Sequence, residues 1–327
     1  DTARMFAIDL VGERENAIFK CLDRFKQDLR EIMEADDPER VYWVEKSERK
    51  KRKLITMHAT HLNVAENLDR LLFYNDDLSS AVLTSATLSI GGDFSFLREK
   101  VGCSSALEIS VDSPFSYEDQ CLLYLPQGLP DPREPGFHKG VAPFIRDILN
   151  RTVGRAFVLF TSYRGMNEVW NEFQGCLPWQ LLRQGDLPKN KLIDQFKTDI
   201  HSVLFATTSY WEGVDVPGEA LSCVILVKLP FSVPDDPLTK AKIRSIERSG
   251  GNAFYNYSLP EAVLRLRQGF GRLIRSRNDR GIVAILDPRV RRSSYGRYFI
   301  KGLPTCREIT SLDEIEPFLQ SEQHIKS

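Results

Sequence analysis

Short apolar runs alternate with helical patterns along the chain from Gln120 onward. Such runs are typical of parallel strands buried on both faces of a sheet, and intervening helices are typical of crossover connections. The pattern therefore predicts an α/β fold in which helices cover a parallel sheet. The predicted strands are 121–125, 156–160, 180–183, 202–206, 222–227 and 282–286, and the predicted helices are 141–151, 164–173, 189–197 and 237–249.

The preceding part of the chain has a different pattern. Apolar residues recur at helical spacing near its start, and two strand-like runs follow with the basic segment Ser47–Lys53 between them. A basic segment can contact a nucleic-acid backbone, although we favour the exposed tip of a hairpin here. The predicted elements are a helix over 1–36, strands over 40–45 and 53–61, a short helix over 63–73 and a buried strand over 81–83.

The segment Ser258–Arg277 carries two stripes at the spacing of an α-helix. Ser258 and Glu261 have the spacing of a capping box, which predicts where this helix begins. Gly269 and Gly271 then fall in the helix interior, where each costs about 1 kcal/mol relative to Ala. Their presence suggests that another group approaches this backbone closely. The apolar stripe is formed by Val263, Leu266, Phe270 and Leu273.

The second stripe of this helix is polar and lies on the opposite face. An arginine fork matches phosphate oxygens in a bidentate way, so a row of guanidiniums favours a phosphate ligand. A solvated basic face on a surface helix explains the same composition equally well. The stripe consists of Arg265, Gln268, Arg272 and Arg275.

Composition and charge limit the classes of function. The chain has 327 residues, enough for two domains, and its formal net charge is −1, so any nucleic-acid site must be a local basic patch. No apolar run approaches the roughly 18 residues of a membrane span. The six cysteines are scattered without a C-x-x-C pair. We therefore expect reduced, buried thiols, and no metal or iron–sulfur ligation by this chain.

Hydroxyl side chains follow the ends of three predicted strands. The carboxyl ends of strands are where α/β proteins keep their sites, and a helix that begins there offers N–H groups to phosphates. Taken alone, Thr161 and Ser162 are better explained as helix caps, and the other residues as polar turns or loops. The residues concerned are Thr84, Ser85 and Thr87, then Thr161, Ser162 and Tyr163, then Thr207, Thr208 and Ser209.

The loop after the predicted strand 202–206 adds an aromatic residue and two carboxylates. Trp211 and Glu212 precede Gly213, which permits a tight turn, and Asp215 follows. A carboxylate at this point can orient an arginine through a charge-assisted hydrogen bond. A hydroxyl-rich surface loop remains the alternative explanation.

Four short segments of the sequence resemble motifs III to VI of superfamily 2 helicases, and they occur in the same order. The form of the last two motifs is similar to that of the bacterial DinG-type helicases, which are relatives of XPD. The resemblance runs from about Tyr42 to Asp287, and Lys228–Leu238 and Asn252–Pro260 also look like this family. The motif-like words are Thr84–Leu88 (TSATL), Phe157–Tyr163 (FVLFTSY), Phe205–Gly218 (FATTSYWEGVDVPG) and Gln268–Arg275 (QGFGRLIR).

The resemblance implies ATP and Mg²⁺ as cofactors, bound in a cleft between two RecA-like motor domains. Its catalytic residues would be Arg272 and Arg275, acting as arginine fingers, together with Gln268. The nucleotide would also contact Glu212, Gly213 and Asp215. Single-stranded DNA is the implied partner, and 5′-to-3′ translocation the implied movement. The DNA would be held by Thr84, Ser85, Thr161, Ser162, Tyr163, Thr207, Thr208, Ser209 and Trp211.

The sequence has no Gly-Lys dipeptide and no D-E-A-H word, so we expect it to lack the phosphate-binding loop of the first motor domain. It also begins as though inside a longer protein. The resemblance then divides the chain into the tail of an arch-like helical insertion (1–40), the C-terminal part of the first RecA-like domain (41–118) and the second RecA-like domain (119–327). A missing N-terminal half would complete the ATP site and could hold an iron–sulfur cluster.

We thus expect the C-terminal part of an ATP-dependent DNA helicase, inactive as an ATPase by itself, monomeric, cytoplasmic and without membrane contact. The alternative is a non-catalytic nucleic-acid-binding or interaction module of the same RecA-like fold. An unrelated α/β metabolic enzyme would need a glycine-rich strand-to-helix turn, which the sequence does not contain.

Overall fold

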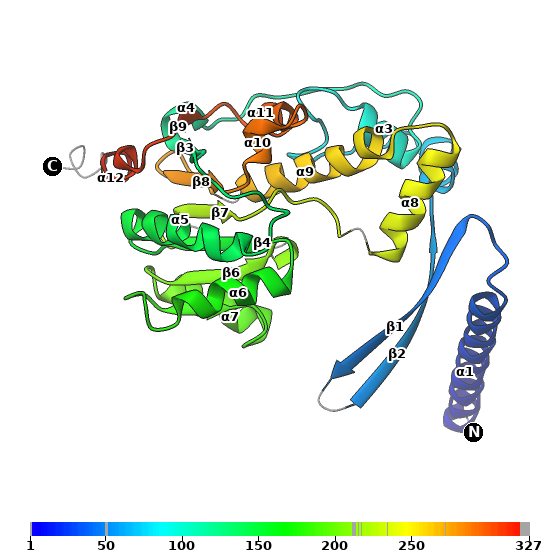
Figure 1. Ribbon diagram of the computed structural model, residues 1–327. Helices are drawn as coiled ribbons and strands as arrows, with labels where there is room; N and C mark the ends of the chain where they lie inside the picture. Colours follow the sequence, from blue (N-terminus) through cyan, green and yellow to red (C-terminus); the bar gives the residue numbers. More distant parts are fainter. Residues whose placement is uncertain are drawn as a thin grey trace.

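The computed structural model describes residues 2–49, 52–210, 214, 216, 218–233, 235–271 and 273–320. Within them a parallel sheet has the strand order β5-β6-β4-β7-β8-β3-β9 (Figure 1). The predicted α/β class is confirmed. The strands are β3 (Cys121–Tyr124), β4 (Ala156–Phe160), β5 (Leu181–Arg183), β6 (Val203–Thr207), β7 (Cys223–Leu226), β8 (Gly281–Ile285) and β9 (Arg307–Ile309).

The apolar runs located six of these strands to within a residue or two, because their side chains are almost all buried. The edge strand β9 was missed. Arg307 and Glu308 are exposed in it, and only Ile309 enters the core, so β9 has no apolar run.

Helices cover both faces of the sheet, and side chains alternate between the faces along each strand. One apolar core lies under α5 (Phe137–Thr152), α6 (Tyr163–Phe173) and α12 (Ile315–Gln320). The other lies under α7 (Lys189–Thr198), α9 (Leu259–Phe270) and α11 (Gly296–Gly302). The remaining helical elements here are η2 (Thr208–Tyr210), α8 (Pro237–Arg248), η3 (Phe254–Ser258), α10 (Arg289–Arg292) and η4 (Leu312–Glu314).

The start of the chain extends away from the sheet in Figure 1, whereas the later part, with α3 (Ser95–Val101), passes close to α9. The long helix α1 (Thr2–Glu34) and the antiparallel hairpin of β1 (Arg40–Arg49) and β2 (Arg52–His61) confirm the predicted helix and strands. The basic segment Ser47–Lys53 thus belongs to the hairpin end, and its Lys50 and Lys51 lie outside the described residues. The other elements are α2 (Ala65–Leu68), the π-helical η1 (Asp69–Phe73) and α4 (Tyr117–Gln120).

The predicted buried strand Ala81–Leu83 was wrong. This segment has no regular structure, and Val82 is 87% exposed. A strand forms only where another strand pairs with its backbone groups, and no strand pairs with this segment among the described residues.

The helix predicted over Ser258–Arg277 is shorter and begins differently. Helical backbone already runs through Ser258, at φ −65° and ψ −42°, so its side chain forms no cap hydrogen bond and the predicted capping box is absent. Helix α9 ends at Phe270, and Gly271 is its C-cap rather than an interior residue. The apolar face is confirmed, since Val263, Leu266, Phe270 and Leu273 are all buried.

None of the helices in the described part of the chain is both long enough and apolar enough to cross a bilayer.

Candidate functional site

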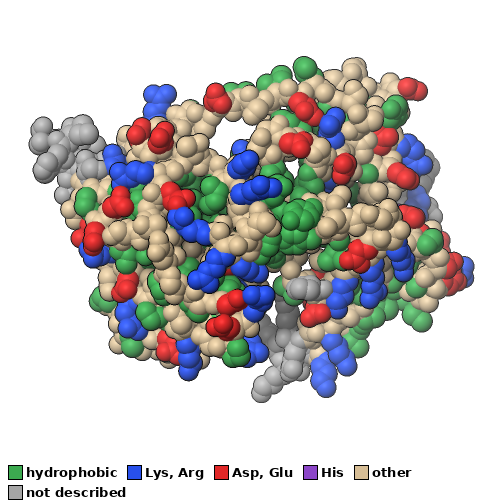
Figure 2. Space-filling model, turned by 45° about the horizontal axis from the view of Figure 1, so that its top comes forward, with side chains coloured by type: hydrophobic (Ala, Val, Ile, Leu, Met, Phe, Trp, Pro, Cys, Tyr) green, Lys and Arg blue, Asp and Glu red, His purple; other side chains and the backbone are tan. Residues whose placement is uncertain are grey.

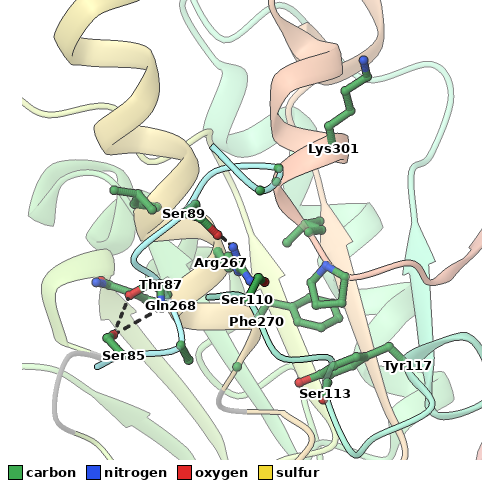
Figure 3. A pocket seen from close by; sticks show the side chains of 18 of the residues that line it. Ser85, Thr87, Ser89, Ser110, Ser113, Tyr117, Arg267, Gln268, Phe270 and Lys301 are labelled. Atoms are coloured by element: carbon green, nitrogen blue, oxygen red, sulfur yellow. Dashed lines mark hydrogen bonds between the residues drawn. The ribbon is translucent and has the colours of Figure 1, made fainter. Parts of the chain in front are cut away.

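A cavity of about 1100 Å³ lies against the outer face of α9. Its other walls are the loop 85–92, the segment 110–117 and the end of α11 with the residues up to Pro304 (Figure 3). The loop contains Ser85 and Thr87 of the predicted hydroxyl cluster. Of the predicted polar stripe, α9 carries Arg265 and Gln268, whereas Arg275 lies beyond the end of the helix. The structure therefore brings together two segments that are far apart in the sequence.

Hydroxyl groups form one side of this cavity and the amide of Gln268 part of the other. The Oγ atoms of Ser85 and Thr87 are 3.3 Å apart, and the main-chain N–H of Thr87 donates to Ser85 Oγ at 3.2 Å. Two predicted site residues, Ser85 and Gln268, thus line one cavity. Thr84 lies beside it, with its side chain exposed.

The side chain of Arg267 links the two walls. Its Nη1 donates a hydrogen bond of 2.7 Å to the carbonyl oxygen of Ser89, which is buried. Lys100 of α3 also pairs with Glu261 near the start of α9. Sequence reasoning missed Arg267, because its acceptor is a main-chain carbonyl that leaves no trace in the side-chain pattern.

The lining of the cavity is suited to an anionic ligand. More cationic than acidic side chains face it, and cations close together raise the local concentration of anions. Aromatic rings form an apolar floor, where the ring centroids of Tyr117 and Phe270 are 5.4 Å apart. The charged lining residues are Lys100, Arg265, Arg267 and Lys301, against Asp112 and Glu261.

Arg275 lies beyond the end of α9, in the loop 271–280 that leads to β8. Its main-chain N–H donates to Asp279 Oδ2 at 2.8 Å. Burial of the guanidinium lowers the pKa of Arg275, and the nearby Asp279 acts in the opposite direction. An arginine remains charged at neutral pH in either case.

The predicted residues Arg272, Glu212, Gly213, Asp215 and Trp211 lie outside the described residues. The expected approach of Asp215 to the arginines therefore stays a prediction.

A second group of predicted residues meets at the carboxyl ends of β4 and β6, which are neighbours in the sheet. Gln184 joins them: its Nε2 donates to Tyr163 Oη at 2.5 Å, and its Oε1 accepts from the main-chain N–H and the hydroxyl of Thr207, at 2.7 and 2.9 Å. Sequence reasoning also missed Gln184, which follows the short strand β5 without any motif around it.

The other predicted residues of this group differ in their roles. Ser162 accepts a hydrogen bond from the main-chain N–H of Gly165 at 3.2 Å, so it caps α6 as the alternative reading held. Thr161 and Thr208 are half-buried beside it. The side chain of Ser209 lies outside the described residues.

One basic residue, Lys228, also lies near the carboxyl ends of these strands. Lys228 follows β7, donates to the carbonyl oxygen of Pro132 at 2.9 Å and lies 4.6 Å from the ring centroid of Phe137. Burial lowers the pKa of Lys228. In Figure 2, Lys and Arg side chains gather across the middle of one face, so basic surface is local even though the net charge is −1.

No group of three or more His, Cys, Asp or Glu residues that could hold a metal occurs among the described residues. The expected burial of the six cysteines is confirmed in part. Cys121 and Cys223 are buried and Cys103 and Cys306 are half-buried, whereas Cys21 and Cys176 are exposed.

Comparison with known proteins gives consistent matches. Residues 145–306 match the family model of the helicase C-terminal domain. The chain is 38% identical over 307 residues to the ATP-dependent DNA helicase YoaA of Haemophilus influenzae, covering 94% of this chain and 47% of that protein. It is 34% identical over 286 residues to the ATP-dependent helicase DinG of Mycobacterium tuberculosis, covering 86% of this chain and 42% of that protein.

A third relative carries a different activity in its name. The chain is 35% identical over 315 residues to the 3′-5′ exonuclease DinG of Bacillus subtilis, covering 93% of this chain and 34% of that protein. The chain thus spans less than half the length of each of these relatives.

Solved structures agree on the fold. One named XPD_APO superposes with a TM-score of 0.60 at 19% identity, covering 88% of this chain and 59% of that one. Another, named XPD_Helicase, gives 0.58 at 17% identity, covering 83% and 48%. At these identities the likeness concerns the fold alone, and it confirms the predicted RecA-like sheet covered by helices.

Proposed function

We propose, from the premise that this chain belongs to the family of bacterial ATP-dependent helicases that includes YoaA and DinG, that it forms one wall of the nucleotide site and part of the DNA track of a DNA helicase. One observation carries the proposal. The cationic face of α9 and the hydroxyl loop after residue 84 border the same cavity, although they lie far apart in the sequence.

At the nucleotide, the proposed roles follow from charge. Arg272 and Arg275 act on the γ-phosphate, where guanidiniums stabilise the charge that develops during phosphoryl transfer, an effect worth about 10³–10⁵ in rate in related enzymes. Gln268 lines the cavity and contacts the nucleotide or the attacking water. Glu212, Gly213 and Asp215 are further proposed contacts of the nucleotide.

The residues present fit the phosphate part of ATP, because the cavity lining offers cations and hydroxyl donors. Mg²⁺ and the loop that holds the β- and γ-phosphates come, in this proposal, from the part of the protein that the longer relatives have in addition. When bound, Mg²⁺ would neutralise phosphate charge. The chain by itself therefore hydrolyses no ATP.

DNA contacts are proposed at the carboxyl ends of β4 and β6, where Tyr163 and Thr207 are joined through Gln184. Hydroxyl and basic groups there contact the backbone of single-stranded DNA, so binding is independent of sequence and weakens with salt. The proposed track is extended by Thr84, Ser85, Thr161, Ser162, Thr208, Ser209 and Trp211. Closure of the cleft on ATP moves the track in the 5′-to-3′ direction.

The same proposal assigns three domains: an arch-like tail (1–40), the C-terminal part of a first RecA-like domain (41–118) and the second RecA-like domain (119–327). The exposure of apolar residues in 41–118 supports it. Val82, Leu107 and Val111 are 87%, 89% and 85% exposed in segments without regular structure, as expected of apolar segments that lack their neighbours. We infer a monomer that acts in the cytoplasm.

The test replaces the arginines in the complete helicase. Arg275→Ala and Arg272→Ala should each lower DNA-stimulated ATP hydrolysis by at least about a hundredfold, with binding of single-stranded DNA retained. Arg248→Ala is the matched control, since Arg248 is an exposed arginine at the end of α8. Unchanged hydrolysis in both variants would overturn the proposed role and favour a non-catalytic nucleic-acid-binding module.

A further inference from the structure

The loop 271–280, which carries Arg275, is fixed through its backbone. Asp279 Oδ2 accepts hydrogen bonds of 2.8 Å from the main-chain N–H groups of both Arg275 and Ser276, and Asp279 Oδ1 accepts from Ser276 Oγ at 2.8 Å. These contacts determine the direction in which the backbone of Arg275 runs after α9 ends. They lie within the loop and so cannot place it relative to the rest of the molecule.

The buried side chains of Leu273 and Ile274 attach the loop to the apolar core, and the side chain of Gln120 adds a polar connection near Arg275. Its Nε2 donates to the carbonyl oxygens of Ser276 and Asp279, at 2.9 and 2.8 Å. Gln120 is only 6% exposed. Its side-chain amide therefore keeps these hydrogen bonds to the protein rather than replacing them with hydrogen bonds to water. Both N–H groups of the amide are used on the loop.

The sheet register explains why Gln120 reaches this place. Strands β3 and β8 pair in parallel with Cys121 opposite Gly281. The residue before β3 therefore lies beside the residues before β8, which are the end of the arginine loop. The short helix α4 carries Gln120 at its last position and packs Tyr117 against Phe270, the last residue of α9.

We propose that Gln120 is a positioning residue for Arg275, which fixes the arginine loop to the sheet so that the guanidinium is in place before the nucleotide binds. This inference rests on the proposed function of Arg275 at the nucleotide. A misplacement of about 1 Å in such a group can lower a rate by up to about a hundredfold. Gln120 thus affects the chemical step without touching the substrate.

The first experiment needs no activity and uses the 327-residue chain. Gln120→Met keeps the length and burial of the side chain but removes both N–H donors. Hydrogen exchange at the amides of Arg275 and Ser276 should become at least about tenfold faster, while the amides of β8 keep their protection. Gln195→Met, at an exposed glutamine of α7, is the control. Unchanged exchange at Arg275 and Ser276 would overturn the proposal.

The second experiment is a double-mutant cycle in the complete helicase. Gln120→Met should lower kcat for DNA-stimulated ATP hydrolysis about tenfold and leave KM for ATP within about twofold. In an Arg275→Ala background the same change should have no further effect, because the residue that it positions is gone. The same fold loss in both backgrounds would show a merely structural role and overturn the inference.

The two proposals can fail separately. If Arg275→Ala leaves hydrolysis intact, the proposed function of Arg275 fails. The hydrogen-exchange experiment then still decides whether Gln120 holds the backbone of the loop in place. If Arg275→Ala abolishes hydrolysis and Gln120→Met changes nothing, only the positioning role is lost. Should Gln120→Met not fold, Gln120→Asn serves, since its shorter amide cannot reach both carbonyls and the same outcomes apply.

Discussion

The guanidinium of Arg267 and the carbonyl oxygen of Ser89 form a hydrogen bond of 2.7 Å between residues 178 positions apart. Ser89 continues into a tight turn, in which Ile90 and Asp93 exchange main-chain hydrogen bonds of 2.9 and 3.2 Å. Asp93 then accepts from the main-chain N–H of Ser95 at the start of α3. The loop beside the cavity is therefore attached to α9 at one defined point.

Removal of that hydrogen bond should loosen the loop. Arg267→Ala is expected to lower the free energy of unfolding by about 1–2 kcal/mol, since a hydrogen bond from a charged donor is lost and the carbonyl of Ser89 stays buried. Urea unfolding of the chain measures this, and hydrogen exchange over 89–93 should rise. The control Arg248→Ala should stay within about 0.5 kcal/mol. Equal losses in the two variants would contradict the role given to Arg267.

Two glycines near the end of α9 should respond differently to alanine. A Cβ on Gly281 would lie 2.3 Å from Cγ of Leu273, whereas one on Gly271 would meet nothing nearer than 3.6 Å. Gly281→Ala is therefore expected to cost about 1–3 kcal/mol of stability through overpacking, and Gly271→Ala less than about 1 kcal/mol. Thermal unfolding of the two variants makes the comparison.

The cause of the Gly281 effect can be tested separately. If the clash with Leu273 is responsible, Gly281→Ala should cost less in a Leu273→Ala background than in the original chain. An unchanged cost would assign the effect to the backbone instead.

Acid should destabilise the fold partly through His138. This ring is partly buried, and its Nδ1 lies 2.7 Å from Glu168 Oε2. Burial lowers the pKa of His138 below its usual 6.5, and the hydrogen bond to Glu168 only partly offsets this. The unfolded chain therefore binds a proton near pH 6.5 more readily than the folded chain, so stability falls as the pH drops from about 7 through 6.5 and below.

His138→Gln should flatten that dependence. The variant removes the titrating group but keeps a polar side chain beside Glu168. Urea midpoints measured between pH 7.5 and 5.5 should decline less steeply in the variant than in the original chain. A parallel decline in both would indicate that other groups cause the pH dependence.

The cysteines should divide sharply in reactivity. Cys21 and Cys176 are exposed, whereas Cys121 and Cys223 are buried, and burial raises the pKa of both buried thiols well above the usual range. Since the thiolate is the reactive form, a thiol reagent at neutral pH should label the first pair in the folded protein and the second pair only after unfolding. Mass spectrometry of the labelled peptides reads this out, and labelling of Cys223 in the native protein would contradict its burial.

Single-stranded DNA binding should depend on Gln184. Gln184→Met removes the hydrogen bonds that join Tyr163 to Thr207, so the two proposed contact residues lose their common support. Affinity for an oligothymidine should fall by about 3–10-fold, the equivalent of roughly one hydrogen bond. Fluorescence anisotropy at fixed salt measures it, with Gln195→Met as the control. If Gln184→Met and the original chain bind the oligonucleotide with equal affinity, Gln184 has no role in DNA binding.

The sequence predicted the sheet well because burial of its strands is two-sided. Runs such as Ala156–Phe160 are apolar at every position, and that pattern has few alternatives. The apolar face of α9 was predicted for a similar reason. Prediction failed where strand formation depends on a neighbouring strand. Ala81–Leu83 is equally apolar, but no strand among the described residues pairs with it.

The candidate site was predictable only through its side-chain motifs. Gln268 and Ser85 were identified because their words resemble known motifs, and the structure places both at one cavity. Arg267, Gln120 and Gln184 were not identified. The first two act on main-chain carbonyls, and all three depend on contacts that the folded sheet creates. The end of α9 was misjudged because the 3.6-residue pattern of apolar side chains continues past Gly271, whereas the helix itself ends at Phe270.

The uncovered side chains of Val82, Leu107 and Val111 have a practical consequence for anyone handling these 327 residues in isolation. Exposed, apolar and unpaired segments recruit one another between molecules, so a concentrated preparation should self-associate, and lysine replacements at these positions should keep it dispersed.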